Sequence, residues 1–589
     1  MLIYIREIDI NNYSNICNDI GVLANNDLIN RKIQSINLNS ASLRSDGSCL
    51  DLSNIYIYCE SVHNYKKDDL RDILIFDEKT VSAVIIDKNL LTGCPYCFDS
   101  KLKTNIELYG VRKAKLYDST SVIFLTLVFH YFHNIPIAIC NIMPEQNWSL
   151  MMPLANCNNC KDIIRTPDDF RNIYVTEKNI ISDSSAIKNN ITTEQQSNNF
   201  LENNRLFIGF SAVMSNFVKI DEEKEVNLIG SPIFLSNEDN NYEISGGKGK
   251  TLCQAAASCL GEGLERYFLS GIFSEKEIKT NKDNPLIINI EKEFGFPYHQ
   301  PNYHFKEYEP NLIISWVKSE DLTHNQEIYL PSNIIFCPDI KSETYISPSS
   351  TNGAACGANL YEATTKSLLE LIERDAFYFY ARTNQSVKHV PLELLPHDIK
   401  NIINNHDWAD FQIMVLPSPF ENIFVTQTVL TNKNNNGSLT SRGTGANINF
   451  YDSIQKSINE CLQMYYSLSS NEIINKANLD MRYLWYTGEA KNKFSNFFHP
   501  KHFIMKINEF NTHIEDVVQH IINSAKKQNL NVYRHTILNT PTFSVVKTAM
   551  SQITSIDGIY LKNNIRYQQF AKLLNLNPII INYNGSLFM

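Results

Sequence analysis

Short apolar runs separated by polar turns dominate the first part of the chain. Runs of three or four apolar residues at 55–58, 73–76 and 84–86 are typical of buried strands. The stretch 119–131 is apolar over a greater length and predicts a helix. We therefore expect an N-terminal α/β layer.

A polar segment interrupts this pattern between residues 177 and 204. Ser, Asn, Thr and Gln dominate it, as in Ser182–Ser185 and Thr192–Asn199. A segment with few large apolar residues buries too little surface to offset the entropy lost on ordering. The composition predicts a linker at 177–204 between an N-terminal domain, 1–176, and a C-terminal domain, 205–589.

Three stretches of the C-terminal domain combine helical periodicity with acidic residues one turn apart. The first follows the glycine-rich stretch 246–250 and starts after Thr251, which can cap a helix. Ser258, Glu262 and Glu265 then share one helical face. The ordinary alternative is a solvated face on which Glu262 forms an ion pair with the arginine four residues later.

The same pattern recurs twice further along the chain. The second copy follows a Thr-Asn-Gly turn at 351–353, and the third follows the glycine-bearing stretch 441–447. In the third copy an amide replaces the second carboxylate. Their polar residues are Glu370, Glu373 and Arg374 in the second copy, and Glu460 and Gln463 in the third.

Carboxylates gathered from several helices would repel one another unless cations lay between them. Oxygen ligands in this number suit Mg²⁺, which usually bridges nucleotide phosphates. Lys248 and Arg374 are available to the same phosphates. The pattern favours a metal–nucleotide site over three ordinary amphipathic helices.

The overall charge and the apolar stretches exclude other function classes. The 589 residues carry a net charge of −10 with no dense Lys/Arg run, which argues against nucleic-acid binding. The most apolar stretch, 122–140, is interrupted by His and Pro and is too short and polar to span a bilayer. The first residues lack a hydrophobic export segment, so we expect a cytoplasmic protein without membrane contact.

Thirteen cysteines include two C-x-x-C pairs about sixty residues apart. Two such pairs complete a tetrahedral zinc site. Because thiolates fill all four positions, the zinc is predicted to be structural. The alternative is four buried or redox-active thiols without a metal. The predicted ligands are Cys94, Cys97, Cys157 and Cys160.

The three helical motifs resemble those of the YcaO family. G-G-K-G-x-T with A-x-x-S-x-x-x-E-x-x-E-R lies at 246–266, T-N-G with E-x-x-E-R-D-A at 351–376, and G-x-G-A with E-x-x-Q at 443–463. The resemblance covers roughly 205–589 and implies an α/β (α+β) fold whose ATP site phosphorylates a peptide amide oxygen. Carried over by position, it implies Mg²⁺ ligands at Glu262, Glu265, Glu370, Glu373 and Glu460, and nucleotide, metal or phosphate contacts from Ser211, Lys248, Ser258, Arg374 and Gln463.

The N-terminal domain is similar to the zinc-bearing, E1-like domain fused to YcaO in cyclodehydratases of ribosomal peptides. T-G-C-P-Y-C at 92–97 and the second C-x-x-C carry this similarity. No winged-helix leader-binding module is recognised before residue 70. The resemblance therefore implies a separate ThiF-like protein that captures the leader of the precursor peptide. It leaves open a flavin-dependent azoline dehydrogenase and a homodimer.

The implied activity is ATP- and Mg²⁺-dependent conversion of Cys, Ser or Thr into thiazoline or oxazoline, as in bacteriocin biosynthesis. Lys547 stands where the family commonly has Arg, and the stretch 577–589 has one proline where azoline-forming members have a proline-rich tail. These departures leave thioamidation, with sulfide as the nucleophile, and a nucleotide-binding scaffold as alternatives. A zinc-dependent nucleic-acid binder is disfavoured by the acidic charge. The sequence assigns no general base.

Overall fold

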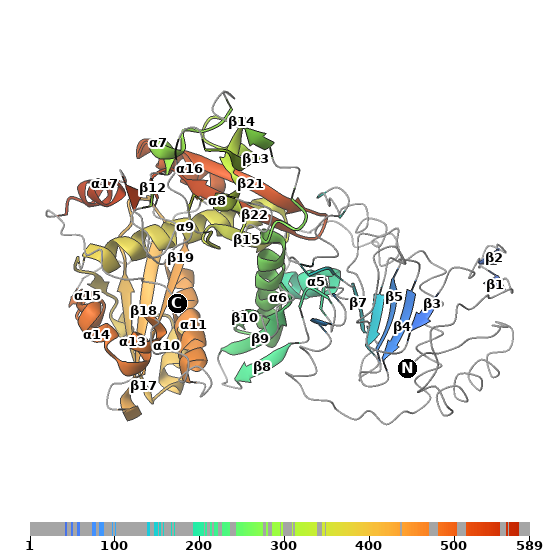
Figure 1. Cartoon of the computed structure of the whole chain (residues 1–589). Coiled ribbons are helices and arrows are strands. Elements are labelled where there is room, and N and C mark those ends of the chain that lie inside the picture. Colours follow the sequence, from blue (N-terminus) through green and yellow to red (C-terminus); the bar gives the residue numbers. More distant parts are fainter. Residues whose placement is uncertain are drawn as a thin grey trace. The chain divides into compact units, whose positions relative to one another are not determined.

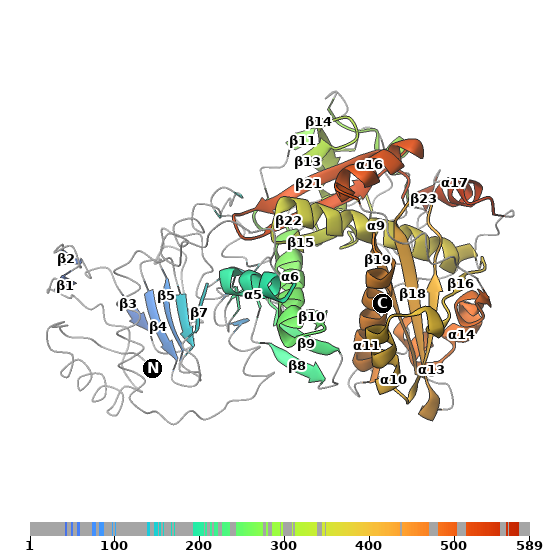
Figure 2. The ribbon, with the colours of Figure 1, turned by 180° about the vertical axis from the view of Figure 1, so that it is seen from behind.

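The computed structural model describes the C-terminal part of the chain almost continuously (Figures 1 and 2). Between residues 42 and 235 it describes strands, one helix and short segments. The chain forms two compact units, 1–218 with 231–245, and 219–230 with 246–589. With short gaps, the described C-terminal ranges are 243–297, 309–383, 385–435, 439–469, 481–502, 514–553 and 561–576.

The N-terminal unit contains a five-stranded sheet of order β3-β4-β5-β6-β7 and a two-stranded pair, β1-β2. β3 and β4 are parallel, and the other neighbours in the larger sheet are antiparallel. The three apolar runs predicted as strands are confirmed, whereas 119–131 lies outside the described residues. The strands are β1 (Ser42–Leu43), β2 (Cys49–Leu50), β3 (Tyr56–Tyr58), β4 (Ile73–Asp77), β5 (Ser82–Ile86), β6 (Ala138–Asn141) and β7 (Asn147–Leu150).

The last part of the predicted linker is a helix, α5 (Thr193–Asn204). Its polar side chains bond to the helix backbone: the Ser197 hydroxyl donates to the Thr193 carbonyl (3.0 Å), and the buried Asn204 amide donates to the Phe200 carbonyl (2.8 Å). Asn204 is the one buried residue of α5, so this helix forms without the apolar burial from whose absence a linker was inferred. The remainder, 177–192, lies outside the described residues.

The division between the units also differs from the predicted boundary at residue 204. Met214 forms a bridge with Ile233, and the Phe234 N–H donates to the Val213 carbonyl (3.1 Å). These contacts join the first residues of the predicted C-terminal domain to the N-terminal unit.

Two large sheets organise the C-terminal unit. One has the order β11-β13-β21-β22-β15 with β14 on β13, and the other has the order β19-β18-β17-β16-β20. A three-stranded sheet, β10-β9-β8, and a pair, β12-β23, complete the strands. Their bounds are β8 (Val218–Asp221), β9 (Asn227–Ile233), β10 (Glu243–Gly249), β11 (Ile278–Thr280), β12 (Phe296–Pro297), β13 (Ile314–Asp321), β14 (Gln326–Pro331), β15 (Ala354–Gly357), β16 (Lys388–His389), β17 (Ala409–Val415), β18 (Phe424–Asn432), β19 (Thr440–Asn447), β20 (Lys501–His502), β21 (Val532–Asn539), β22 (Ser544–Met550) and β23 (Leu561–Lys562).

The three predicted Ser/Glu helices are present as α6, α9 and α11. Figures 1 and 2 show the long helix α9 lying across α6 and α11. No helix among the described residues is long and apolar enough to cross a membrane. The helices of this unit are α6 (Leu252–Leu269), α7 (Ile290–Glu293), α8 (Ser332–Ile335), α9 (Leu360–Thr383), α10 (His397–Asn405), α11 (Phe450–Ser469), α13 (Met481–Thr487), α14 (Ala490–Lys493), α15 (Ser495–Phe498), α16 (Val517–Lys527) and α17 (Arg566–Leu573).

Helix α9 forms the centre of the main hydrophobic core. Phe377 and Phe379 pack in one cluster with Leu430 of β18 and Ile458 of α11. Between residues 367 and 383, every side chain of α9 is buried except Glu370 and Arg374, which keep partial exposure. Two predicted site residues, Glu370 and Arg374, therefore form one polar stripe on a helix that is otherwise enclosed by packing.

Candidate functional site

Each Ser/Glu helix is preceded by a glycine-bearing strand, and glycine permits very close packing between them. A Cβ atom added to Gly247 of β10 would lie 1.9 Å from the Ala255 carbonyl oxygen of α6. One added to Gly443 of β19 would lie 2.2 Å from the Ser457 carbonyl oxygen of α11. Because only glycine allows this approach, the glycine pattern of the sequence fixes how strand and helix pack.

Helix α6 begins as predicted, with the Thr251 hydroxyl accepting from the Gln254 N–H (3.2 Å). Glu262 forms the ion pair with Arg266 that an ordinary helical surface would also form (2.7 Å). Its other oxygen accepts from the Gly246 N–H of β10 (3.0 Å). The carboxylate is therefore held between its own helix and the preceding strand.

Helix α9 repeats this arrangement in the second motif. Glu370 accepts from the Gly353 N–H (3.1 Å), and its other oxygen lies 3.5 Å from Arg374. Burial raises the pKa of Glu370, although Arg374 opposes the shift. Burial alone would lower the pKa of Arg374, but Glu370 and Glu373 raise it, so the arginine stays charged. Two of the three motifs thus place a carboxylate and an arginine in the same geometry.

Glu265 differs from the other glutamates of the site. Among the described residues it has no hydrogen-bond or ion-pair partner, and its side chain is partly exposed. Its pKa is raised to about 8, first by burial and then by the negative charges of Glu370 and Glu262. Arg266 and Lys547 offset only part of that repulsion. A cation placed beside Glu265 would stabilise this group of carboxylates.

Glu373 is buried and fully engaged by protein groups. It accepts from the Thr444 hydroxyl (2.7 Å) and the Ala446 N–H (3.0 Å) of β19, and it pairs with Lys456 of α11 (2.9 Å). Burial by itself would raise its pKa, but Lys456 and Arg374 lower it to about 2. Glu373 therefore joins α9 to β19 and α11 as a permanently charged anchor.

The first and third motifs meet through β10. Lys248 of that strand lies 3.5 Å from Glu460 of α11, and both side chains are about three-quarters buried. A Cβ atom on Gly246 would lie 1.9 Å from the Gln463 amide nitrogen. The strand of the first motif is therefore in direct contact with the helix of the third.

The structure brings most of the predicted ATP and Mg²⁺ residues into one group. Ser258 lies one turn before Glu262 on α6 and is exposed, whereas Ser211 lies outside the described residues. The residues linked through shared contacts or charge interactions are Lys248, Glu262, Glu265, Glu370, Glu373, Arg374, Glu460 and Gln463.

Two further lysines that interact with this group were not predicted as site residues from the sequence. Lys456 precedes Glu460 by one helical turn, so helical spacing could have identified it. Lys547 of β22 donates to the Asn352 carbonyl (2.7 Å) and to the Ser350 carbonyl. Burial lowers the pKa of Lys547 to about 8, while Glu370 and Glu265 oppose the shift. No local spacing connects it with the glutamates.

Two of the four predicted zinc ligands lie among the described residues. Cys97 and Cys157 are both fully buried in one small cluster with Leu154 and Phe234. The Leu154 N–H donates to the Cys97 sulfur (3.2 Å). Cys94 and Cys160 lie outside the described residues, so the complete ligand set stays a prediction.

Within the described ranges, no three Cys, His, Asp or Glu side chains form a ready-made metal cage.

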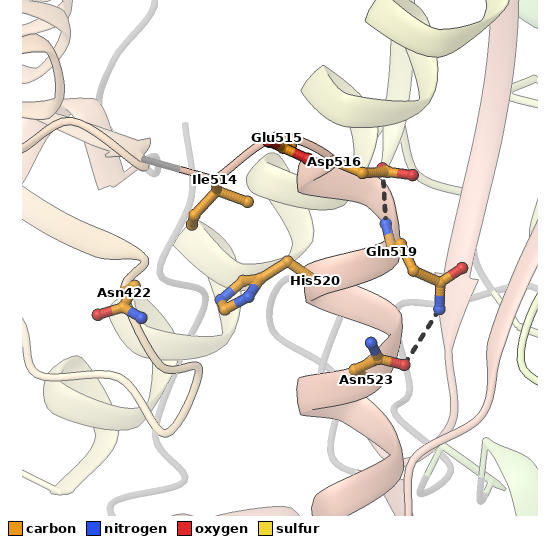
Figure 3. Close-up of a pocket in the computed structure, with 7 residues that line it drawn as sticks. All are labelled: Asn422, Ile514, Glu515, Asp516, Gln519, His520 and Asn523. Carbon is orange, nitrogen blue, oxygen red and sulfur yellow. Dashed lines mark hydrogen bonds between the residues drawn. The ribbon is translucent and has the colours of Figure 1, made fainter. Parts of the chain in front are cut away.

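A separate hollow of about 440 Å³ lies at the start of α16 (Figure 3). Asp516 and His520 line it together with Asn422 of the β17–β18 loop. None of the predicted site residues lines this hollow, so it is distinct from the group of glutamates.

Comparison with known families gives the decisive observation. The model of the family described as YcaO cyclodehydratase, ATP- and Mg²⁺-binding, matches residues 246–552, just over half of the chain. The chain belongs to the YcaO family. The match includes the three helices of the motifs and ends just after β22, and every residue of the group described above lies within it.

An uncharacterized protein of Methanothermobacter thermautotrophicus is 31% identical over 184 residues. The aligned part covers 30% of this YcaO chain, and the chain spans about 45% of that relative's length. Most of each protein therefore lies outside the alignment.

Two solved heterocyclase structures resemble the chain over most of its length. A heterocyclase in complex with substrate and cofactor aligns with a TM-score of 0.63 and 18% identity, covering 87% of this chain and 76% of the other. The heterocyclase TruD aligns with a TM-score of 0.52 and 15% identity, covering 86% and 73%. At such identities the likeness shows the fold, and it confirms the mixed α/β architecture expected from the sequence.

Proposed function

We propose that this YcaO protein is an ATP- and Mg²⁺-dependent cyclodehydratase that converts Cys, Ser or Thr of a ribosomal precursor peptide into thiazoline or oxazoline. The observation that carries the proposal is Glu265, which has no hydrogen-bond or ion-pair partner among the described residues and whose pKa is raised by burial and by the charges of Glu370 and Glu262. A divalent cation would remove this repulsion. The family description, which names ATP and Mg²⁺, supports the same choice.

The residues present fit a metal–nucleotide complex. Carboxylate oxygens are the ligands that Mg²⁺ prefers, and Glu262, Glu265 and Glu370 come from two helices that converge. Glu460 of α11 would add a ligand from the third motif. Glu373, whose oxygens already accept three protein groups, would position α9 against α11.

The cationic side chains are placed for phosphate oxygens. Lys248 and Arg374 each lie about 3.5 Å from a site glutamate, so each is near the proposed metal ligands. Arginine and lysine at such positions bind phosphate by charge-assisted hydrogen bonds. Ser258, which is exposed on α6, and Gln463, which lies against Gly246, are proposed nucleotide contacts, as is Ser211.

The thiol or hydroxyl of the substrate side chain adds to the preceding carbonyl carbon and loses its proton, which leaves an oxyanion. Transfer of the γ-phosphoryl group from ATP to that oxygen releases ADP, and loss of the amide proton together with inorganic phosphate forms the C=N bond of the azoline. Bound Mg²⁺ would neutralise the phosphate charge during this transfer. The chain's own residues orient the reactants and balance charge. No residue is assigned as a general base.

The test is the intact mass of a candidate precursor peptide after incubation with the protein, ATP, Mg²⁺ and a ThiF-like protein. Loss of one water for each modified residue, only with ATP, is the expected result. A gain that matches exchange of oxygen for sulfur when sulfide is supplied would assign thioamidation instead. An unchanged peptide despite bound ATP would favour a scaffold subunit.

We also propose that Cys94, Cys97, Cys157 and Cys160 hold a structural zinc ion in an E1-like N-terminal domain. The burial of Cys97 and Cys157 in one cluster, and the N–H group directed at the Cys97 sulfur, support it. Metal analysis of the purified protein should give one zinc per chain. Much less than one zinc, with all four thiols reactive, would refute this site.

The proposed partners are a precursor peptide and a separate ThiF-like protein that binds its leader. In size-exclusion chromatography of the mixture, the chain should co-elute with the ThiF-like protein. Run alone, the chain should elute as a homodimer. Tight leader binding by this chain alone would contradict the need for a separate protein. A flavin-dependent dehydrogenase would act later, on the azoline product.

A further inference from the structure

Lys547 and Glu370 bind opposite ends of one peptide group. Lys547 of β22 lies opposite Ala354 of β15 in the sheet, and its ammonium donates to the Asn352 carbonyl (2.7 Å). That carbonyl belongs to the same peptide group as the Gly353 N–H, which donates to Glu370 (3.1 Å). The Lys547 ammonium, the dipole of this peptide group and the Glu370 carboxylate are therefore linked in series by two hydrogen bonds, and each of these bonds strengthens the other.

The turn that contains this peptide is fixed on several sides. Gly353 has a left-handed backbone (φ +80°), which favours glycine, and the Ala354 N–H closes the turn onto the Thr351 carbonyl (2.8 Å). The Gly353 carbonyl accepts from the Thr548 N–H (2.7 Å) and from the Ser367 hydroxyl. Strand β22 and helix α9 thus hold the turn together, with Lys547 supplying the positive charge.

Lys547 is buried and binds the backbone of the Thr-Asn-Gly turn. Its side chain is 3% exposed, and its hydrogen bonds go to backbone carbonyls of the turn, those of Ser350 and Asn352. A buried ammonium needs such acceptors because burial without them is costly. Its contacts thus place it one layer outside the carboxylates.

We propose that Lys547 is a positioning residue that holds the Thr-Asn-Gly turn so that the Gly353 N–H fixes one oxygen of Glu370 and leaves the other directed to the metal. The proposal rests on the proposed function, because Glu370 is taken as a Mg²⁺ ligand there. Groups that orient a metal ligand typically change metal affinity by about 10–100-fold when removed.

The experiment compares wild type, Lys547→Met, Lys547→Arg and a surface control, Lys527→Met. Lys527 pairs with Glu421 (2.8 Å), and both side chains are more than half exposed. Two readouts are recorded over a series of Mg²⁺ concentrations: ATP turnover, and the rise in Tm caused by Mg²⁺ with ATP. We expect K547M to raise the Mg²⁺ concentration for half-maximal response by about tenfold or more, and K547R and K527M to stay near wild type.

Each result decides the proposal. A K547M midpoint equal to that of wild type would overturn it, and so would K547R as impaired as K547M, because arginine keeps the charge and the donors. If K547M does not fold, judged by near-UV circular dichroism, K547R alone decides: a midpoint about tenfold or more above that of wild type would overturn the proposal. Wild type that shows the Mg²⁺-dependent Tm rise without turnover would contradict the proposed function, while the Tm midpoints still test Lys547. Wild type without either response would overturn both.

Discussion

The five glutamates of the three motifs differ in how the protein occupies their oxygens. Glu373 accepts from a lysine, a hydroxyl and a backbone N–H, whereas Glu265 has no such partner among the described residues. Glu262 and Glu370 lie between these extremes, each with one oxygen held by a glycine N–H. The environment, rather than the shared spacing, distinguishes a proposed metal ligand from an anchor.

Replacing Glu265 with Gln should separate function from stability. We expect ATP turnover to fall by about a hundredfold or more, because a bound metal contributes several kcal/mol in the transition state. Above about pH 8 and without Mg²⁺, the Tm should stay equal or rise, because there the substitution removes a charge that Glu262 and Glu370 repel. The measurement is steady-state phosphate release beside a thermal melt, and undiminished turnover would contradict the metal role of Glu265.

The same carboxyl gives the protein a pH dependence in the absence of Mg²⁺. Its pKa rises from the usual 4.5 to about 8 on folding, so the folded state binds more protons than the unfolded state in that interval. Raising the pH through this range therefore lowers stability. We expect a steeper decline of Tm between pH 5 and about 8 for wild type than for E265Q. Parallel Tm curves for the two proteins would contradict this assignment.

At the scale of elements, the close packing of glycine strands on Ser/Glu helices is testable with matched substitutions. Gly443→Ala would place a Cβ atom 2.2 Å from the Ser457 carbonyl oxygen and 2.3 Å from the Cys461 nitrogen. We expect a loss of about 1–3 kcal/mol in the free energy of unfolding, measured by urea denaturation.

Gly261→Ala is the matched control for that substitution. Gly261 lies inside α6, and a Cβ atom there would meet nothing within 4 Å. Because alanine favours a helix over glycine, we expect a gain of up to about 1 kcal/mol. Equal effects of the two substitutions would show that the close approach of β19 to α11 does not matter for stability.

Local patterns identified these elements because the information lay within a few residues. Helical spacing put Glu262 and Glu265 on one face, and Thr251 caps that helix as expected. Helix α5 was missed because its residues are mostly polar and Asn204 alone is buried, whereas the composition argument took apolar burial as the condition for order. Periodicity reports apolar burial, so a polar helix gives it little signal.

At the scale of the whole molecule, contacts between distant parts of the sequence limited the prediction. Lys547 reaches the turn at 350–352 across nearly two hundred residues, and Arg566 forms a fully buried ion pair with Asp375 of α9 across a similar separation. Both pairings depend on which strands and helices become neighbours. The order of motifs identified the family without specifying these neighbours.

The most direct test of the central claim is the ratio of phosphate released to water lost from the precursor peptide. Phosphate release and intact peptide mass are measured in the same reaction with wild type and E265Q. The account predicts one phosphate for each water lost with wild type, and neither product above background with E265Q. Phosphate release without any mass change in the peptide, or equal peptide modification by E265Q, would contradict it.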